Sequence, residues 1–268
     1  MNTDATTHTS SRPTVLITGI TGTLGQALGK WYMDRDWTVI GVTRQTIDSL
    51  EACSRIVSNP QITAEDARTL AELAPDLVYL NAGAIETDIG PGGEPLTEAL
   101  YTLTTVNYTF PAAFALEAAK SAKKPMDIIC IGSIADGSPS CFGPLYHASK
   151  IALHYFVQGT APILKHAHPH VTLRLYRPGA IFGPLSWAPV NRLNRRGHKI
   201  RAKRCENAPR ADEVAAHIDA FRQSRRGIRK YDEPVSFRFL KLLFALAPDL
   251  YYRLQHFAWR KTNRFVNS

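Results

Sequence analysis

Short runs of consecutive apolar residues alternate along the chain with longer stretches that repeat an apolar residue at helical spacing. The apolar runs predict strands at residues 14–18, 38–42, 55–58, 76–83 with its following turn, 126–133 and 171–176. The helical spacing predicts helices at 24–34, 64–74, 97–122, from 145 onward and at 210–223. Strands that are apolar throughout are buried on both faces. The pattern therefore predicts an α/β fold, a Rossmann-type doubly wound parallel sheet with helices on both faces.

The pattern of apolar and polar residues changes at both ends of the predicted α/β fold and once within it. Residues 1–12 are polar, with no apolar region typical of a secretory signal, and predict a disordered lead. Residues 13–232 are the predicted dinucleotide-binding domain. Within it, residues 185–210 are rich in Arg and Asn and lack a clear period, which predicts a basic substrate lid. Residues 233–268 predict an amphipathic helical tail that Pro248 divides into two short helices.

Charge adds an expectation about partners. The 268 residues include 32 Lys or Arg and 23 Asp or Glu, a net charge of +9, which favours anionic partners. No recognition motif accompanies that charge, so we expect no nucleic-acid partner. The four cysteines lack ligand spacing, and the histidines of KHAHPH (165–170) have no acid or cysteine beside them, so we expect no metal. Free cysteines are typical of a cytoplasmic protein.

A glycine-rich turn, TGITGTLG, directly follows the first predicted strand and opens the first predicted helix. Gly19 permits the tight turn, Gly22 lets the backbone approach a pyrophosphate, and Gly25 lets the helix lie close to the sheet. The unpaired N–H groups at the helix N-terminus then face the phosphates. The turn predicts dinucleotide binding, and a purely structural glycine turn is the alternative.

The end of the second predicted strand indicates which dinucleotide is bound. Folds that prefer NAD usually place an acid there for the ribose hydroxyls, whereas this chain has Thr43 and Arg44. A guanidinium can make charge-assisted hydrogen bonds to a 2′-phosphate. We therefore predict NADP(H) in preference to NAD(H). In the alternative, Arg44 is a solvated surface arginine.

Six short motifs follow one another in an order typical of a known enzyme family. They are TGITGTLG (18–25), LNAG (80–83), VN (106–107), IGS (131–133), YHASK (146–150) and RPG (177–179). Over about residues 13–230 the chain resembles the short-chain dehydrogenase/reductases. Its glycine pattern, TGxxGxxG, is similar to that of the longer branch of the family, which is rich in nucleotide-sugar enzymes. The chain is too short for the substrate domain of that branch.

The resemblance implies that Tyr146 is the general acid in carbonyl reduction and the base in the reverse reaction. Lys150, one helical turn later, would lower the pKa of Tyr146 by its positive charge and hold the nicotinamide ribose. Ser133 would hydrogen-bond the substrate oxygen, and Asn107 would support a proton relay through water. In the alternative, Tyr146 and Lys150 are only neighbours on a helix. The agreement of Ser133 and Asn107 with the family pattern argues against that.

The resemblance also implies a set of cofactor contacts from five parts of the chain. These residues are Thr18, Gly19, Thr21, Gly22, Thr23, Leu24, Gly25, Thr43, Arg44, Asn81, Ala82, Gly83, Tyr146, Lys150, Pro178, Gly179 and Ile181. The Asn81–Gly83 turn would lie beneath the adenine and ribose, and Pro178 and Gly179 would face the nicotinamide. The hydride comes from the cofactor, so the protein supplies position and a proton.

Together these residues predict an NADP(H)-dependent oxidoreductase that interconverts a ketone or aldehyde and an alcohol. One alternative is a reductase or epimerase of nucleotide-sugars or other polysaccharide precursors. Another, from a different class, is a non-catalytic NADP(H)-binding sensor. Family members are often dimers or tetramers, so the resemblance also implies a homo-oligomer.

The predicted lid bears on the substrate. Between residues 191 and 204 it has no acid and seven cations, Arg192, Arg195, Arg196, Lys199, Arg201, Lys203 and Arg204. This charge favours an anionic carbonyl or alcohol substrate. The alternative is a solvated lid without a specific ligand.

The predicted tail bears on partners, because it is apolar, aromatic and basic. Helices of this composition can lie at a membrane interface. Peripheral membrane contact through the tail is therefore one expectation. The alternative is packing of the tail on its own domain or at a subunit interface.

Overall fold

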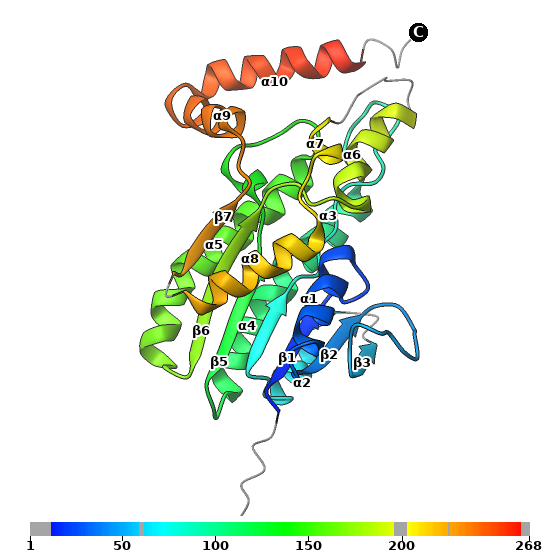
Figure 1. Cartoon of the computed structure of the whole chain (residues 1–268). Coiled ribbons are helices and arrows are strands. Elements are labelled where there is room, and N and C mark those ends of the chain that lie inside the picture. Colours follow the sequence, from blue (N-terminus) through cyan, green and yellow to red (C-terminus); the bar gives the residue numbers. More distant parts are fainter. Residues whose placement is uncertain (1–11, 59–61, 196–202, 225, 264–268) are drawn as a thin grey trace, which may run out of the picture.

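The computed structural model describes residues 12–58, 62–195, 203–224 and 226–263 (Figure 1). Seven strands form one parallel sheet in the order β3-β2-β1-β4-β5-β6-β7. They are β1 (Thr14–Thr18), β2 (Thr38–Thr43), β3 (Arg55–Ser58), β4 (Leu77–Leu80), β5 (Met126–Ile131), β6 (Val171–Pro178) and β7 (Ile228–Tyr231). The predicted doubly wound parallel sheet is confirmed.

Helices cover both faces of this sheet (Figure 1). They are α1 (Thr23–Met33), α2 (Ala64–Glu72), α3 (Thr97–Thr104), the π-helix η1 (Thr105–Thr109), α4 (Phe110–Ser121), the 3-10 helix η2 (Ile134–Gly137), α5 (Pro144–Ala167), α6 (Pro184–Arg195), α7 (Lys203–Glu206), α8 (Ala211–Gln223), α9 (Val235–Leu246) and α10 (Pro248–Asn263). One core packs α2, α4 and α5 on the sheet, and a second packs α1 and α8 on the opposite face.

The strand β7 is absent from the predicted pattern. Its residues, IRKY, include two cations and no apolar run, and none of them is fully buried. An edge strand needs only one neighbour, here β6, so it does not require the apolar character that marks the inner strands.

Most of α6 and all of α7 lie within the predicted lid. Three of its seven cations, Arg196, Lys199 and Arg201, lie outside the described residues. The tail consists of α9 and α10, which lie beyond the carboxyl ends of the strands, on the side where α6 and α7 also lie (Figure 1). Within the described chain, no helix is both long and apolar enough to span a membrane.

Candidate active site

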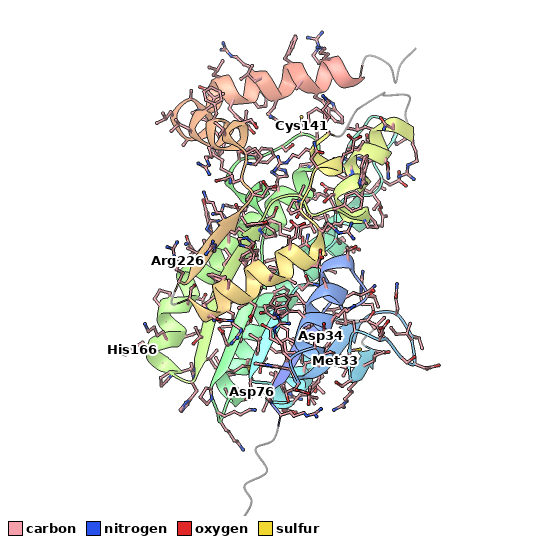
Figure 2. All side chains as sticks on the ribbon, in the orientation of Figure 1. Met33, Asp34, Asp76, Cys141, His166 and Arg226 are labelled. Carbon is pink, nitrogen blue, oxygen red and sulfur yellow. The ribbon has the colours of Figure 1, made fainter. Side chains whose placement is uncertain are left out.

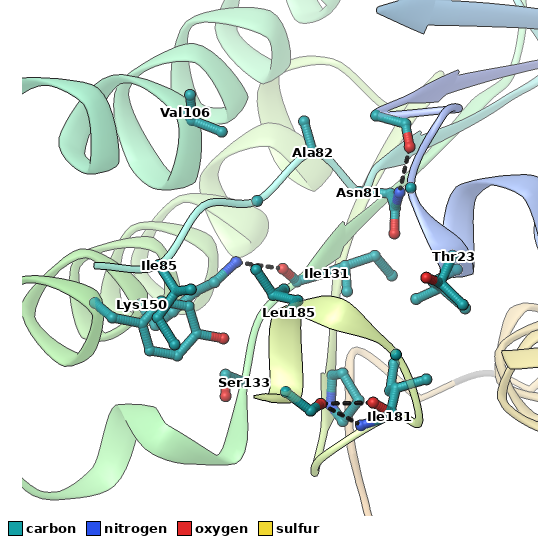
Figure 3. Close-up of a pocket in the computed structure, with 18 of the residues that line it drawn as sticks. Thr23, Asn81, Ala82, Ile85, Val106, Ile131, Ser133, Lys150, Ile181 and Leu185 are labelled. Atoms are coloured by element: carbon teal, nitrogen blue, oxygen red, sulfur yellow. Dashed lines mark hydrogen bonds between the residues drawn. The ribbon is translucent and has the colours of Figure 1, made fainter. Parts of the chain in front are cut away.

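A cavity of about 960 Å³ lies at the carboxyl ends of the central strands (Figure 3). In open α/β sheets, ligands bind in this position, where the strand order reverses. Here the order reverses between β1 and β4. All of the predicted cofactor residues except Gly25 line the cavity, as do Ser133, Tyr146 and Lys150.

The glycine turn closes one end of the cavity. Gly19 has a φ of +68°, and a Cβ there would lie 2.8 Å from the Cα of Ala82. Gly25 does not line the cavity, because it packs against the turn: a Cβ at Gly25 would lie 2.2 Å from the carbonyl oxygen of Gly19. The Thr18 hydroxyl accepts hydrogen bonds from the backbone N–H groups of Asn81 (2.9 Å) and Ala82 (3.0 Å). These contacts hold the ends of β1 and β4 together.

The first turn of α1 fits the phosphates of a dinucleotide. Its N-cap is Gly22, and no side chain caps it within the described structure. The residues around that cap line the cavity, so the N-terminal N–H groups of α1 are available to an anion. The described lining includes the cations Arg44, Lys150 and Arg204 and no Asp or Glu. This cavity therefore favours anionic contents.

Ser133, Tyr146 and Lys150 come together because β5 ends beside the start of α5. Ser133 follows β5 and caps η2, with its hydroxyl accepting a hydrogen bond from the N–H of Ala135 (3.1 Å). Tyr146 and Lys150 lie one turn apart on α5, and the Lys150 Nζ is 5.9 Å from the centre of the Tyr146 ring. The buried ammonium of Lys150 donates to the carbonyl of Ile131 at 3.0 Å (Figure 3).

The pKa of Tyr146 is raised in this structure, contrary to the predicted lowering. Burial raises the pKa of Tyr146; a hydrogen bond with Ser133 opposes this, and the charges of Asp136 and Glu86 add to it. Burial also lowers the pKa of Lys150 to about 8. The phenol of Tyr146 is therefore protonated at neutral pH, which is the state that a general acid requires.

Asn107 lies behind the cavity rather than in its lining. It is fully buried in the π-helix η1, and its side chain accepts from the N–H of Ala84 (2.8 Å) and donates to the Ala84 carbonyl (2.9 Å). It also donates to Ser149 (2.9 Å), whose hydroxyl donates to the carbonyl of Tyr146 (2.8 Å). Asn107 thus ties the segment after β4 to α5. Its role in a proton relay stays a prediction.

Glu86 is a buried residue that the sequence analysis missed. Its carboxylate accepts from the backbone N–H groups of Leu145 (2.7 Å) and Tyr146 (3.3 Å). A carboxylate in this position stabilises the N-terminus of a helix, here the helix that carries Tyr146. Arg192 of α6 is also buried and donates to the carbonyls of Glu86 (3.2 Å) and Phe142 (2.5 Å). Glu86 is far in sequence from the start of α5 and from Arg192, so no short motif indicates these contacts.

A buried ionic cluster behind Ser133 was missed as well. Asp136 lies three residues after Ser133. Its carboxylate accepts two hydrogen bonds from the guanidinium of Arg177, and the distance from Arg177 Nε to Asp136 Oδ2 is 2.7 Å. His154 Nδ1 lies 3.1 Å from the same carboxylate. Burial raises the pKa of Asp136, but hydrogen bonds from His154 and Arg177 outweigh it and hold the pKa below its usual value. The position of Arg177 could have indicated this cluster, because a cation within an apolar strand needs a buried partner.

The tail contributes one residue to the described lining of the cavity. Phe237 of α9 lines it, and the guanidinium of Arg204 lies 4.4 Å from the Phe237 ring centre. One face of α10 contacts the segment before α5 through Tyr251, Gln255 and Trp259. The Tyr251 hydroxyl, for example, donates to the carbonyl of Pro139 at 2.6 Å. The contacts of α10 join residues more than a hundred positions apart, so composition alone could not predict them.

The parallel sheet and the cavity at the carboxyl ends of its strands define a Rossmann-type nucleotide-binding enzyme. The family model described as short chain dehydrogenase matches residues 13–194, more than half of the chain. The chain belongs to the short chain dehydrogenase family and is an NAD(P)-dependent oxidoreductase.

Solved structures of the same family share the fold. A short chain dehydrogenase from Burkholderia cenocepacia J2315 in complex with NADP is 17% identical, with a TM-score of 0.66, and the match covers 91% of this chain and 98% of that one. A short-chain dehydrogenase from Sphingobium yanoikuyae in complex with NADPH is 20% identical, with a TM-score of 0.66 and coverage of 87% and 93%.

A third similar structure contains the other dinucleotide. It is a 3-oxoacyl-(acyl-carrier protein) reductase from Brucella melitensis in complex with NAD, 18% identical, with a TM-score of 0.67 and coverage of 82% and 95%. No curated protein sequence matches the chain. At these identities the likeness is one of fold.

Proposed function

We propose that the protein is an NADP(H)-dependent reductase that converts a ketone or aldehyde into an alcohol, with Tyr146 as the general acid. The observation that carries this proposal is that Tyr146 lines one cavity together with Ser133 and Lys150. A general acid must hold its proton at working pH and lie where the reacting oxygen can reach it. The reverse reaction, alcohol oxidation, would use the same residues.

The dinucleotide, when bound, supplies the hydride. The chain's own residues hold it and manage the proton. The N-terminus of α1 and the turn held by Thr18 receive the phosphates. The Ser133 hydroxyl orients the carbonyl oxygen, and Tyr146 donates its proton to that oxygen. The ammonium of Lys150 then stabilises the phenolate that forms.

The test is the loss of NADPH absorbance with purified protein and two pools of substrates. One pool holds hydrophobic ketones and acyl thioesters, and the other holds keto nucleotide-sugars. We expect turnover in the first pool. Turnover in the second pool alone would support the nucleotide-sugar alternative. NADPH binding without turnover in either pool would contradict the proposed reductase and favour a binding protein.

The cofactor preference rests on Arg44, which is exposed and lines the cavity at the end of β2. We expect Arg44→Ala to weaken NADPH binding by about ten- to a hundredfold, because a charge-assisted hydrogen bond contributes about 1.5–3 kcal/mol. NADH binding is expected to stay nearly unchanged. Isothermal titration of both dinucleotides measures the ratio.

The control for this variant is Arg55→Ala. Arg55 is an exposed arginine at the amino end of β3, away from the cavity. Equal losses for NADPH and NADH in Arg44→Ala would contradict the proposed preference.

An anionic substrate is supported by Arg204 more than by the other cations of the lid. Arg192 is engaged with carbonyl groups, and Arg195 donates to the carbonyl of Thr87 at 2.9 Å. Arg204 lines the cavity, and its Nε is buried with no hydrogen-bond partner among the residues that the structure describes. A buried donor without an acceptor is costly unless a ligand supplies one. The guanidinium of Arg204 suits a carboxylate or phosphate on the substrate.

We therefore expect Arg204→Gln to raise KM for an anionic carbonyl substrate by about tenfold or more, with kcat little changed. Steady-state kinetics on a matched pair, a keto acid and its neutral ester, separates charge recognition from general damage to the site. Lys203→Gln, on an exposed neighbour that does not line the cavity, is the control. An equal rise in KM for the neutral ester would contradict the role of Arg204.

A further inference from the structure

The helices α9 and α10 carry several of their apolar residues on the outside. On α9 the residues Val235, Phe239, Leu242 and Leu246 recur at helical spacing, and on α10 Leu250, Leu254 and Phe257 do the same. Each of these seven side chains is at least 45% exposed. A surface helix normally turns such a stripe toward the core. We call these seven residues the outer stripe.

The exposure of the outer stripe does not come from loose attachment of the helices. Tyr251, Gln255 and Trp259 form a different face of α10 and contact the segment before α5. Figure 2 shows Cys141 below α10, where its backbone N–H donates to the side chain of Gln255 at 2.9 Å. On α9, Lys241 binds Glu233 at 2.6 Å. These inner contacts fix which face of each helix points outward.

Cations flank the outer stripe on α10. Of the five cations between residues 235 and 263, Arg238 and Lys241 pair with Glu233, whereas Arg253, Arg260 and Lys261 lie on α10; the acid in this range is Asp249. On α10, Phe257 has Arg253 one turn before it and Arg260 and Lys261 one turn after it, all exposed. Residues three and four apart are neighbours on a helix surface. The outward face of α10 therefore combines an aromatic ring with a rim of positive charge.

This charge discriminates between two kinds of partner. In a symmetric contact with a second copy, the same patch meets itself. Two such patches would bring like charges together, which costs free energy. A bilayer with anionic headgroups instead accepts both parts of the surface, because the apolar side chains enter the acyl boundary and the cations meet the headgroups.

We propose that the outer stripe docks on the surface of an anionic lipid bilayer, with α9 and α10 lying in the interface. The helices lie beyond the carboxyl ends of the strands (Figure 1), and Phe237 on the inner side of α9 lines the cavity. Docking would therefore bring the cavity close to the bilayer. The proposal depends on the surface alone and does not require the proposed reductase activity.

The test is co-sedimentation of the full-length protein with vesicles, without cofactor or substrate. We expect binding to mixed phosphatidylcholine and phosphatidylserine vesicles, and at least about tenfold weaker binding to phosphatidylcholine alone. The double variant Phe239→Ser, Phe257→Ser is expected to weaken binding to the mixed vesicles by at least about tenfold. Circular dichroism checks that this variant is folded.

The matched control is Tyr101→Ser, Ile163→Ser, which removes two comparably exposed apolar side chains from α3 and α5. It is expected to bind the mixed vesicles like the unchanged protein. Absence of binding, or equal binding by the tail variant, would overturn the proposal. Light scattering of the lipid-free protein gives another outcome that would overturn the proposal. In that outcome the unchanged protein is dimeric, the tail variant is monomeric, and the two bind vesicles equally. That outcome would assign the outer stripe to a second copy of the chain.

Discussion

Replacing Tyr146 with phenylalanine is expected to lower kcat by about 10²- to 10⁴-fold, the usual contribution of a general acid. The phenol is the protonated group that lines the cavity beside Ser133. Phenylalanine keeps the ring and its packing, so the dissociation constant for NADPH should change little. Single-turnover oxidation of NADPH with an accepted carbonyl substrate measures the chemical step directly.

Tyr155→Phe is the matched control, because Tyr155 is on the same helix and is exposed. It should react like the unchanged protein. A Tyr146→Phe variant that retains most of its single-turnover rate would show that another group supplies the proton. His147 also lines the cavity and would then be the first to examine.

Replacing Asp136 with asparagine is expected to lower the free energy of unfolding by about 3–5 kcal/mol, the range for breaking a buried ion pair. The Asp136 side chain is fully buried, and its neutralisation would leave the guanidinium of Arg177 buried without a counter-charge. Because Ser133 and Asp136 are both in or next to η2, activity should fall too. Urea unfolding, followed by circular dichroism, measures the loss.

The pH dependence of this loss distinguishes the ion pair from packing. The pKa of Asp136 is below its usual value in the folded protein. Its contribution is therefore complete above the pKa of the unfolded chain and disappears as the pH falls through the folded pKa. The stabilities of the two proteins should converge at acidic pH. Asp212→Asn, at an exposed pair with Arg210, should change stability little at any pH. A difference for Asp136→Asn that does not depend on pH would contradict the electrostatic explanation.

The inner strands could be predicted because each is buried on both faces, and continuous apolar runs such as residues 14–18 and 126–131 have few other uses. The glycine turn was equally informative, since Gly19 needs a positive φ and Gly25 needs contact with the backbone of Gly19. Both are local constraints that a short motif can carry. Tyr146 and Lys150 followed from their family motif.

The rest depends on which distant residues meet. Nothing near Glu86 in sequence indicates that it binds the start of α5. The pKa of Tyr146 is raised rather than lowered because burial, a property of the whole fold, outweighs the hydrogen bond with Ser133. The lid illustrates the same limit, since Arg192 and Arg204 have the same charge but different surroundings. One is engaged with two carbonyl groups, and the other lines the cavity.

The contact between α10 and the segment before α5 has a thermodynamic consequence. Tyr251 and Gln255 contact Pro139 and Cys141, only a few residues before Tyr146. A ligand of the outward face would alter the affinity of the cavity for its own ligand only by shifting these contacts. Linkage then requires that the cavity ligand alter binding at α10 by the same factor. The segment that Tyr251 and Gln255 contact is the physical connection through which such reciprocity would act.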